Sequence, residues 1–249
     1  MVEANGVTAK VLGTEFNVNA YDASSVAITL VEGSLEVGCN EGKRRIEPGQ
    51  QALIDKSGVN VTAIDTIDNE AWAAIGADNR WRIENHEKWY NYVVNEMVPT
   101  IRHLAGLANG YDQGILTFGA SMGAMHAANL YYRRPDLFDS CFAISGLYDN
   151  KEFFGSYCDD LVYNNCPCLY LQNLPDGHYY RDMYNSQKSL IVCGQGAWEE
   201  PLLESTRWLD TVCCQKGIHT RFEYWGKDVN HDWPWWYKMV QTYLPWFLG

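Results

Sequence analysis

The sequence of 249 residues predicts an α/β fold, a mostly parallel sheet with flanking helices, preceded by an N-terminal all-β segment. Up to about Val61, short runs alternate apolar with polar residues, which is typical of antiparallel strands that bury one face. After Ile64, helical and strand patterns follow one another, which is typical of a parallel sheet covered by helices. This change of pattern predicts two domains, residues 1–62 and residues 63–249.

The first domain is expected to be an antiparallel meander or a small roll. Turns are predicted at residues 32–33, 40–42 and 48–49, where glycine or proline interrupts the strand pattern. A further strand is predicted at residues 51–54, and the basic run at residues 43–45 is expected in a solvated turn. The alternating apolar positions of the other strands are Phe16, Val18 and Ala20, then Val26, Ile28 and Leu30, then Leu35, Val37 and Cys39.

The second domain is expected to open with a long helix that Pro99 bends. A short buried strand is then predicted at residues 115–118 and a helix from about residue 123 to residue 132. Further strands are predicted at residues 142–145, 190–193 and 222–225. The apolar positions that recur at helical spacing in the first helix are Trp89, Val93, Met97, Ile101 and Leu104.

A strand, a tight turn and a helix follow directly on one another around Ser121. The strand leads into Gly-Ala-Ser-Met-Gly, which is the G-x-S-x-G pattern in the setting that this motif requires. Glycine is expected at Gly119 and Gly123 because side chains at both positions would collide with backbone around a strained serine. The pattern predicts Ser121 as a nucleophile, with the Met122 N–H at the helix amino terminus donating to a developing oxyanion.

A serine hydroxyl becomes a good nucleophile when an imidazole removes its proton, so a histidine must reach Ser121. Along the chain of such folds the order is serine, acid, histidine. His231 follows the last predicted strand, in the loop GKDVNHDWPWW, and is therefore expected to be the base. The other histidines are interpreted as structural: His86, His103, His126, His178 and His219.

The carboxylate that orients this base is expected just after the preceding strand, in the run Trp-Glu-Glu-Pro. Glu199 is favoured, Glu200 is the second choice, and Asp228, three residues before the histidine, is the third. An alternative interpretation stays open, because both glutamates also fit the start of a helix, where the dipole favours acids.

Residues near these positions are candidates for binding a substrate. Tyr148, Asp149 and Phe153 follow the strand after the motif and are expected at the mouth of the site. Trp233 lies close to His231 in the chain, so it is expected either to line an acyl pocket or to begin the last helix. Tyr148 and Trp233 are the predicted substrate-binding residues.

Charge and composition exclude several classes of protein. The net charge of -12 and the absence of a basic cluster argue against a nucleic-acid partner. No apolar run reaches the roughly 20 residues that span a bilayer, and the amino terminus lacks the layout of a secretory signal. The eight cysteines are interpreted as free thiols in a reducing compartment, so a cytoplasmic location without a metal or other cofactor is predicted.

Three segments of the first domain resemble the closing part of a FecR-type domain. They are VLGTEFNVNAY at residues 11–21, LVEGSLEV at residues 30–37 and EPGQQALID at residues 47–55. In that family the strands belong to the periplasmic half of a membrane-anchored anti-sigma regulator. The resemblance, which covers about residues 7–61, implies a periplasmic location as the alternative to the cytoplasm.

From about Ile64 to the end, the chain resembles the esterase family of α/β-hydrolases that is related to esterase D and the mycolyltransferases. The resemblance implies Ser121 as nucleophile, His231 as base, an acid within GQGAWEEP, and ester or acyl-transfer chemistry without a cofactor. The segments that carry it are TIDNEAW, WYNYVVNEMVPTI, GASMGAMHAANLYYRRPDLF, SGLYD, GQGAWEEP and WGKDVNHDWPWW.

Members of that family begin with further strands and a loop that donates a second oxyanion N–H, and this segment is not found before Ile64. The sequence therefore predicts an incomplete α/β-hydrolase fold. The predicted function is a serine hydrolase that cleaves a small-molecule carboxylic ester through an acyl-enzyme. The same residues would serve an acyltransferase, and a non-catalytic binding or signalling module with an inactive hydrolase scaffold is the alternative from another class.

Overall fold

A computed structural model describes residues 71–103 and 114–248 in full, and the backbone of seven N-terminal strands and of residues 104–109. The chain divides into two compact units, which are described separately. One comprises Met1–Thr66 and His103–Tyr111, and the other comprises Ile67–Arg102 and Asp112–Gly249.

The strands of the first unit form two antiparallel sheets rather than one meander. One sheet has the order β1-β2-β5-β6 and the other has the order β3-β4-β7. The bounds are β1 (Val2–Ala4), β2 (Val7–Val11), β3 (Glu15–Asn19), β4 (Ser25–Glu32), β5 (Leu35–Cys39), β6 (Gly42–Ile46) and β7 (Gln51–Asp55).

The prediction that residues 43–45 form a solvated turn is wrong. These basic residues lie in β6, where Arg44 is opposite Val37 of β5. β6 ends its sheet, and charged side chains are common in edge strands because they discourage pairing with other chains.

The second unit contains a four-stranded parallel sheet, which confirms the α/β prediction. Its strands are β8 (Leu116–Ala120), β9 (Ser140–Ile144), β10 (Lys188–Cys193) and β11 (Arg221–Tyr224), in the spatial order β11-β10-β9-β8. Each overlaps a strand that the sequence predicts. The central strands β9 and β10 are buried almost throughout, as expected for strands that helices cover on both faces.

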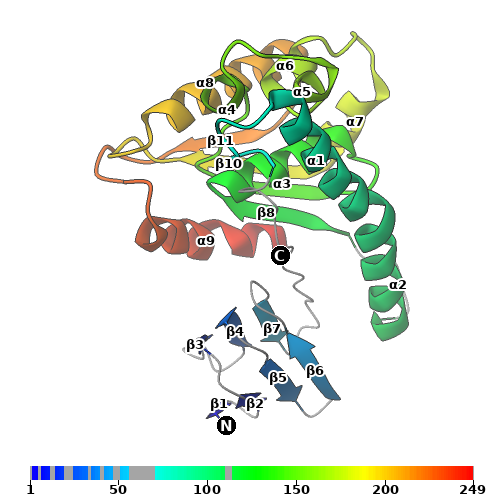
Figure 1. Cartoon of the computed structure of the whole chain (residues 1–249), viewed down its shortest axis with the longest axis vertical. Helices are drawn as coiled ribbons and strands as arrows, with labels where there is room; N and C mark the ends of the chain where they lie inside the picture. The colour runs from blue at the N-terminus through cyan, green and yellow to red at the C-terminus, as the bar shows by residue number, and fades with distance from the viewer. Residues whose placement is uncertain are drawn as a thin grey trace. The chain divides into compact units, whose positions relative to one another are not determined.

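Helices lie on both faces of this sheet (Figure 1). The first helical run comprises α1 (Asn79–Tyr92), the π-helical η2 (Val93–Met97) and α2 (Val98–Asn109). The remaining helices are α3 (Met122–Arg133), α4 (Lys151–Phe154), α5 (Asp160–Asn164), α6 (Pro167–Gln172), α7 (Tyr179–Ser186), α8 (Glu200–Lys216) and α9 (Trp233–Leu248). None of the helices in the described part of the chain is long and apolar enough to cross a membrane.

The helix is irregular immediately before Pro99, where the sequence predicts a bend. A proline ring clashes with the carbonyl four residues earlier, which is that of Asn95. The structure widens this turn into η2, where the Val98 N–H donates to the carbonyl of Val93, five residues back.

The two faces of the sheet pack against different helices. Phe142, Ile144, Leu190 and Val192 alternate along β9 and β10 and form a buried cluster with Met239 and its neighbours on α9. The opposite face contacts α3 and α8. The sheet therefore lies between two layers of helices, and loops follow the carboxyl ends of its strands.

Candidate active site

Four loops meet at the carboxyl edge of the parallel sheet. Ser121 follows β8, Ser145 follows β9, residues 194–199 follow β10, and residues 225–232 follow β11. Because all four strands are parallel, these loops leave the sheet on the same side (Figure 1). In open α/β sheets this edge is where ligands bind.

Ser121 has a strained backbone conformation. Its φ and ψ are 55° and -121°, values that a residue with a side chain rarely adopts, and its N–H donates to the Ile144 carbonyl at 2.9 Å. A Cβ at Gly119 would collide with the backbone of Gly123, so β8 approaches α3 too closely for any other residue. The sharp turn holds Ser121 at the amino terminus of α3.

The expectation that Gly123 is required for the same reason is wrong. A Cβ built on Gly123 meets no atom within 4 Å. The crowding in this turn is one-sided, because the Gly119 position faces the first turn of α3 whereas the Gly123 position faces open space.

The structure brings His231 to Ser121. The imidazole Nε2 lies 2.9 Å from the Ser121 Oγ, which is a hydrogen-bond distance. The backbone N–H of His231 donates to the carbonyl of Ala197 at 3.0 Å. The rings of His231 and the buried Trp236 pack edge to face, with their centroids 4.8 Å apart. A backbone hydrogen bond and a ring contact therefore both hold His231 in place.

Glu199 is the carboxylate closest to this imidazole among the three that the sequence proposed. It is 1% exposed, and its Oε2 lies 3.5 Å from the His231 Nδ1. This distance is within the range of an ion pair but is too long for a hydrogen bond. The two atoms would have to move about half an ångström closer to form one. Glu200 and Asp228 are exposed.

Glu199 occupies the N-cap position of α8 but makes no capping hydrogen bond. Its carboxylate turns toward the sheet instead, where Oε1 accepts a hydrogen bond from Ser145 at 2.7 Å and Oε2 one from the Cys193 thiol at 3.6 Å. The geometry therefore does not match the alternative in which this acid serves the helix dipole.

The loops that carry Glu199 and His231 are tied to each other. The Gly196 N–H donates to the carbonyl of Val229 at 2.8 Å, and the Ala197 N–H donates to the Asn230 Oδ1 at 2.9 Å. A side chain at Gly196 would collide with both acceptors. Glu199 and His231 are thus positioned as one unit.

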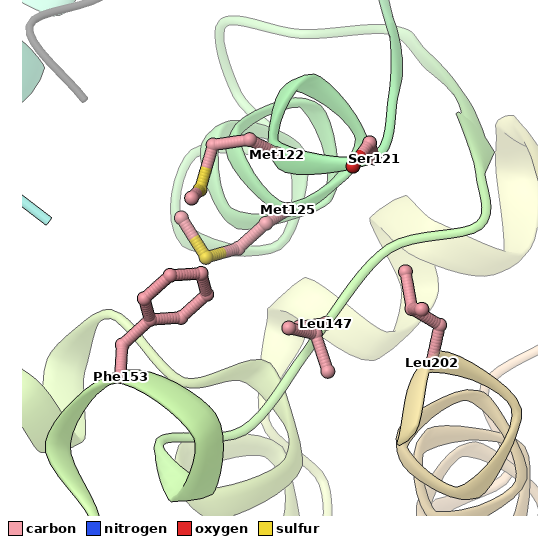
Figure 2. Close-up of a pocket in the computed structure, with 6 residues that line it drawn as sticks. All are labelled: Ser121, Met122, Met125, Leu147, Phe153 and Leu202. Atoms are coloured by element: carbon pink, nitrogen blue, oxygen red, sulfur yellow. The ribbon is translucent and has the colours of Figure 1, made fainter. Parts of the chain in front are cut away.

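A small pocket of about 40 Å³ opens beside Ser121. Met122 and Met125 of α3 point toward Phe153 of α4, and Leu147 and Leu202 complete the lining (Figure 2). Apart from Ser121 the lining is apolar, so it suits an uncharged group. Met122 is also the first residue of α3, where helix geometry leaves backbone N–H groups without an intrahelical partner.

Neither of the predicted substrate-binding residues, Tyr148 and Trp233, lines this pocket. Tyr148 is 0% exposed and does not line the pocket, and burial raises the pKa of its hydroxyl well above the ordinary value. Asp149 is buried and accepts a hydrogen bond from the Lys151 N–H. Trp233 is exposed at the start of α9, where its ring packs edge-on against Trp236. Of the three residues expected at the mouth of the site, Tyr148, Asp149 and Phe153, only Phe153 lines the pocket.

Several residues at the site were missed from the sequence. Met125, Leu147 and Leu202 line the pocket, and Ser145 donates a hydrogen bond to Glu199. Ser145 could have been found, because it follows a parallel strand at the same edge as Ser121. In the described residues, no group of three or more His, Cys, Asp or Glu could hold a metal ion.

A family model described as "Putative esterase" matches residues 10–247. The chain belongs to this esterase family. The match begins within the segment that resembles a FecR-type domain, so the family covers both units of the chain. Among curated proteins, none matches the sequence.

The solved structures that are similar to this chain include three proteins. A ferulic acid esterase has 20% identity and a TM-score of 0.49 over 63% of this chain and 59% of its own. An S-formylglutathione hydrolase from Agrobacterium tumefaciens has 18% identity and a TM-score of 0.49, with 70% and 61% covered. MPT51 of Mycobacterium tuberculosis has 13% identity and a TM-score of 0.49, with 65% and 68% covered. The chain spans less than two thirds of the first two proteins.

The two glycines of the turn provide a matched test of the elbow geometry. Gly119→Ala should lower the free energy of unfolding by about 2–4 kcal/mol, because its methyl group must displace backbone. Gly123→Ala should leave it unchanged or raise it by up to about 1 kcal/mol, since alanine favours the helix. Denaturant titration of both variants measures the difference, and equal destabilisation would contradict the one-sided crowding.

Proposed function

We propose that this esterase-family chain is a serine hydrolase of carboxylic esters, in which Ser121 is the nucleophile, His231 the general base and Glu199 the orienting acid. The observation that carries the proposal is the 2.9 Å contact between the Ser121 Oγ and the His231 Nε2. It joins residues 110 positions apart, at the edge of the sheet where such sites lie. Membership of the esterase family supports ester hydrolysis independently.

In the first half of the reaction, the His231 Nε2 takes the proton of Ser121 while the Oγ forms a bond to the ester carbonyl carbon. The carbonyl oxygen becomes an oxyanion, to which the Met122 N–H donates a hydrogen bond. When this intermediate collapses, the carbon–oxygen bond to the alcohol breaks, and His231 gives its proton to the departing alcohol oxygen. The acyl group remains on Ser121.

In the second half, His231 takes a proton from water, and the resulting hydroxide oxygen attacks the acyl carbon. The bond to the Ser121 Oγ then breaks, and the serine regains its proton from His231. An alcohol in place of water would make the chain an acyltransferase with the same residues. The Glu199 carboxylate stabilises the imidazolium that exists in both halves.

The pocket supports a proposal about the acyl group. Its lining of thioether, aliphatic and aromatic side chains offers no partner for a charge. An ionised group placed there would lose its hydration without compensation, which costs several kcal/mol. We infer that the acyl side of the substrate is short and uncharged.

Fluorophosphonate labelling tests the proposed nucleophile, because the probe reacts with an activated serine whatever the natural ester is. The wild-type protein should be labelled, and Ser121→Ala should not be. Peptide mapping by mass spectrometry should find the adduct on Ser121. A folded wild-type protein that stays unlabelled would contradict the hydrolase function and favour the binding-module alternative.

The adjacent acid Glu200 provides the control for Glu199. Glu199→Gln should lower the maximal labelling rate by about 10³–10⁴-fold. The amide can donate its N–H to the Nδ1 of His231, which favours the tautomer whose Nε2 already carries a proton and cannot accept that of Ser121. Glu200→Gln should change it by no more than about 2-fold, since this side chain is exposed. If Glu200→Gln were the damaging change, the assignment of the acid would be wrong.

Acyl preference can be measured with two p-nitrophenyl esters of equal chain length. We expect kcat/KM for the butyrate to exceed that for the hemisuccinate, which ends in a carboxylate, by at least about 10²-fold. The leaving group is the same in both esters and acts as the internal control. Equal values would mean that the acyl group does not enter the apolar pocket.

A further inference from the structure

The two oxygens of the Glu199 carboxylate have different partners. Oε1 accepts a hydrogen bond from the Ser145 hydroxyl at 2.7 Å, the short distance typical of a hydroxyl that donates to a charged oxygen. Oε2 is the oxygen that faces the His231 Nδ1 at 3.5 Å. A carboxylate can rotate about its bond to the chain, so fixing one oxygen also fixes the direction of the other.

Ser145 stands in a backbone conformation that does not favour serine. Its φ is 51°, in the left-handed region where glycine is free of strain and other residues cost about 1 kcal/mol or more. The side chain is 0% exposed, so water does not satisfy its hydroxyl. A residue that is strained in the backbone and polar in a buried place needs a reason to be serine. Its hydroxyl donates to Glu199, and the Cys193 thiol is a second polar neighbour.

The sheet holds Ser145 in place. Its N–H donates to the carbonyl of Val192 at 2.8 Å, which extends the pairing of β9 with β10 by one residue. The next residue, Gly146, has no room for a side chain because a Cβ would collide with the ring of Tyr148. The hydroxyl of Ser145 is therefore fixed to the end of β9, whereas Glu199 lies at the end of a loop.

We propose that Ser145 is a positioning residue, whose hydroxyl holds the Oε1 of Glu199 and thereby presents the Oε2 to His231. This inference rests on the proposed function, in which Glu199 is the acid of the site. Ser121 follows β8, Glu199 follows β10 and His231 follows β11, and Ser145 follows β9. With Ser145, all four strands of the sheet therefore contribute a residue to the proposed site.

Cys193 supports the same carboxylate from the sheet. Its Sγ lies 3.6 Å from the Oε2 of Glu199. Burial, together with the charge of Glu199, raises the pKa of the Cys193 thiol, so it stays protonated and can donate. A thiol is a weak donor, and for this reason the stronger and shorter bond from Ser145 should dominate the orientation.

The test is fluorophosphonate inactivation of Ser145→Gly over a series of probe concentrations, which separates the maximal rate from the half-saturating concentration. Glycine removes the hydroxyl and relieves the backbone, so the variant should fold. We expect the maximal rate to fall about 10- to 100-fold, the range for losing a hydrogen bond to a charged group. The half-saturating concentration should not change, because Ser145 is buried and does not line the pocket.

A double-mutant cycle distinguishes positioning from a general structural role. In a Glu199→Ala background, Ser145→Gly should change the maximal rate by less than about 2-fold, because the carboxylate that it orients is gone. Ser189→Ala is the matched control. Ser189 is also a buried serine of this sheet, but its hydroxyl donates to Thr220, so the maximal rate should stay at the wild-type value.

Each remaining outcome counts against a specific claim. A wild-type rate in Ser145→Gly, or an equal fall in both backgrounds, would overturn the positioning role. Ser145→Ala is the second variant, and failure of both variants to fold would also overturn it, because positioning predicts a folded protein with a slower site. A wild-type rate in Glu199→Ala would instead overturn the proposed function on which this inference rests.

Discussion

The close backbone contact between Gly119 and the first turn of α3 is the constraint on which the site depends. It forces β8 to turn into α3 within one residue, and Ser121 accepts a left-handed conformation as the result. A hydrogen bond from its N–H to Ile144 ties the turn to the next strand. Strain of this kind persists only where surrounding structure imposes it, and here the sheet and the helix together do so.

The second requirement is that two loops are joined to each other. Hydrogen bonds between residues 196–197 and residues 229–230 join the segment that carries Glu199 to the segment that carries His231. Trp236 then packs against the imidazole from α9. The elbow sets the position of Ser121 and the paired loops set the position of His231, so the 2.9 Å contact is where two separately built parts meet.

The order of elements and the two residues in contact could be predicted from the sequence, because G-x-S-x-G and the last loop are local patterns. The sequence favours Glu199 but leaves Glu200 open, since adjacent residues at a helix start differ only in the direction of their side chains. The buried Tyr148 shows the same limit, because its place depends on the packing around Gly146. The place of Ser145 at a strand end could be predicted, but its hydrogen bond to Glu199 could not, because that bond depends on tertiary packing. Three inferences stay predictions: the FecR-like segment, the absence of a segment that donates a second oxyanion N–H, and the cytoplasmic location. The side chains of the FecR-like segment lie outside the described residues.

The most direct test of the central claim, that His231 activates Ser121, is chemical rescue of His231→Ala by imidazole in an ester hydrolysis assay. Removal of the base should lower kcat by about 10⁴–10⁶-fold while leaving the rest of the site in place. Added imidazole should restore part of the rate with saturation, and it should restore nothing in Ser121→Ala. A His231→Ala protein that hydrolyses esters at the wild-type rate without imidazole would contradict the account.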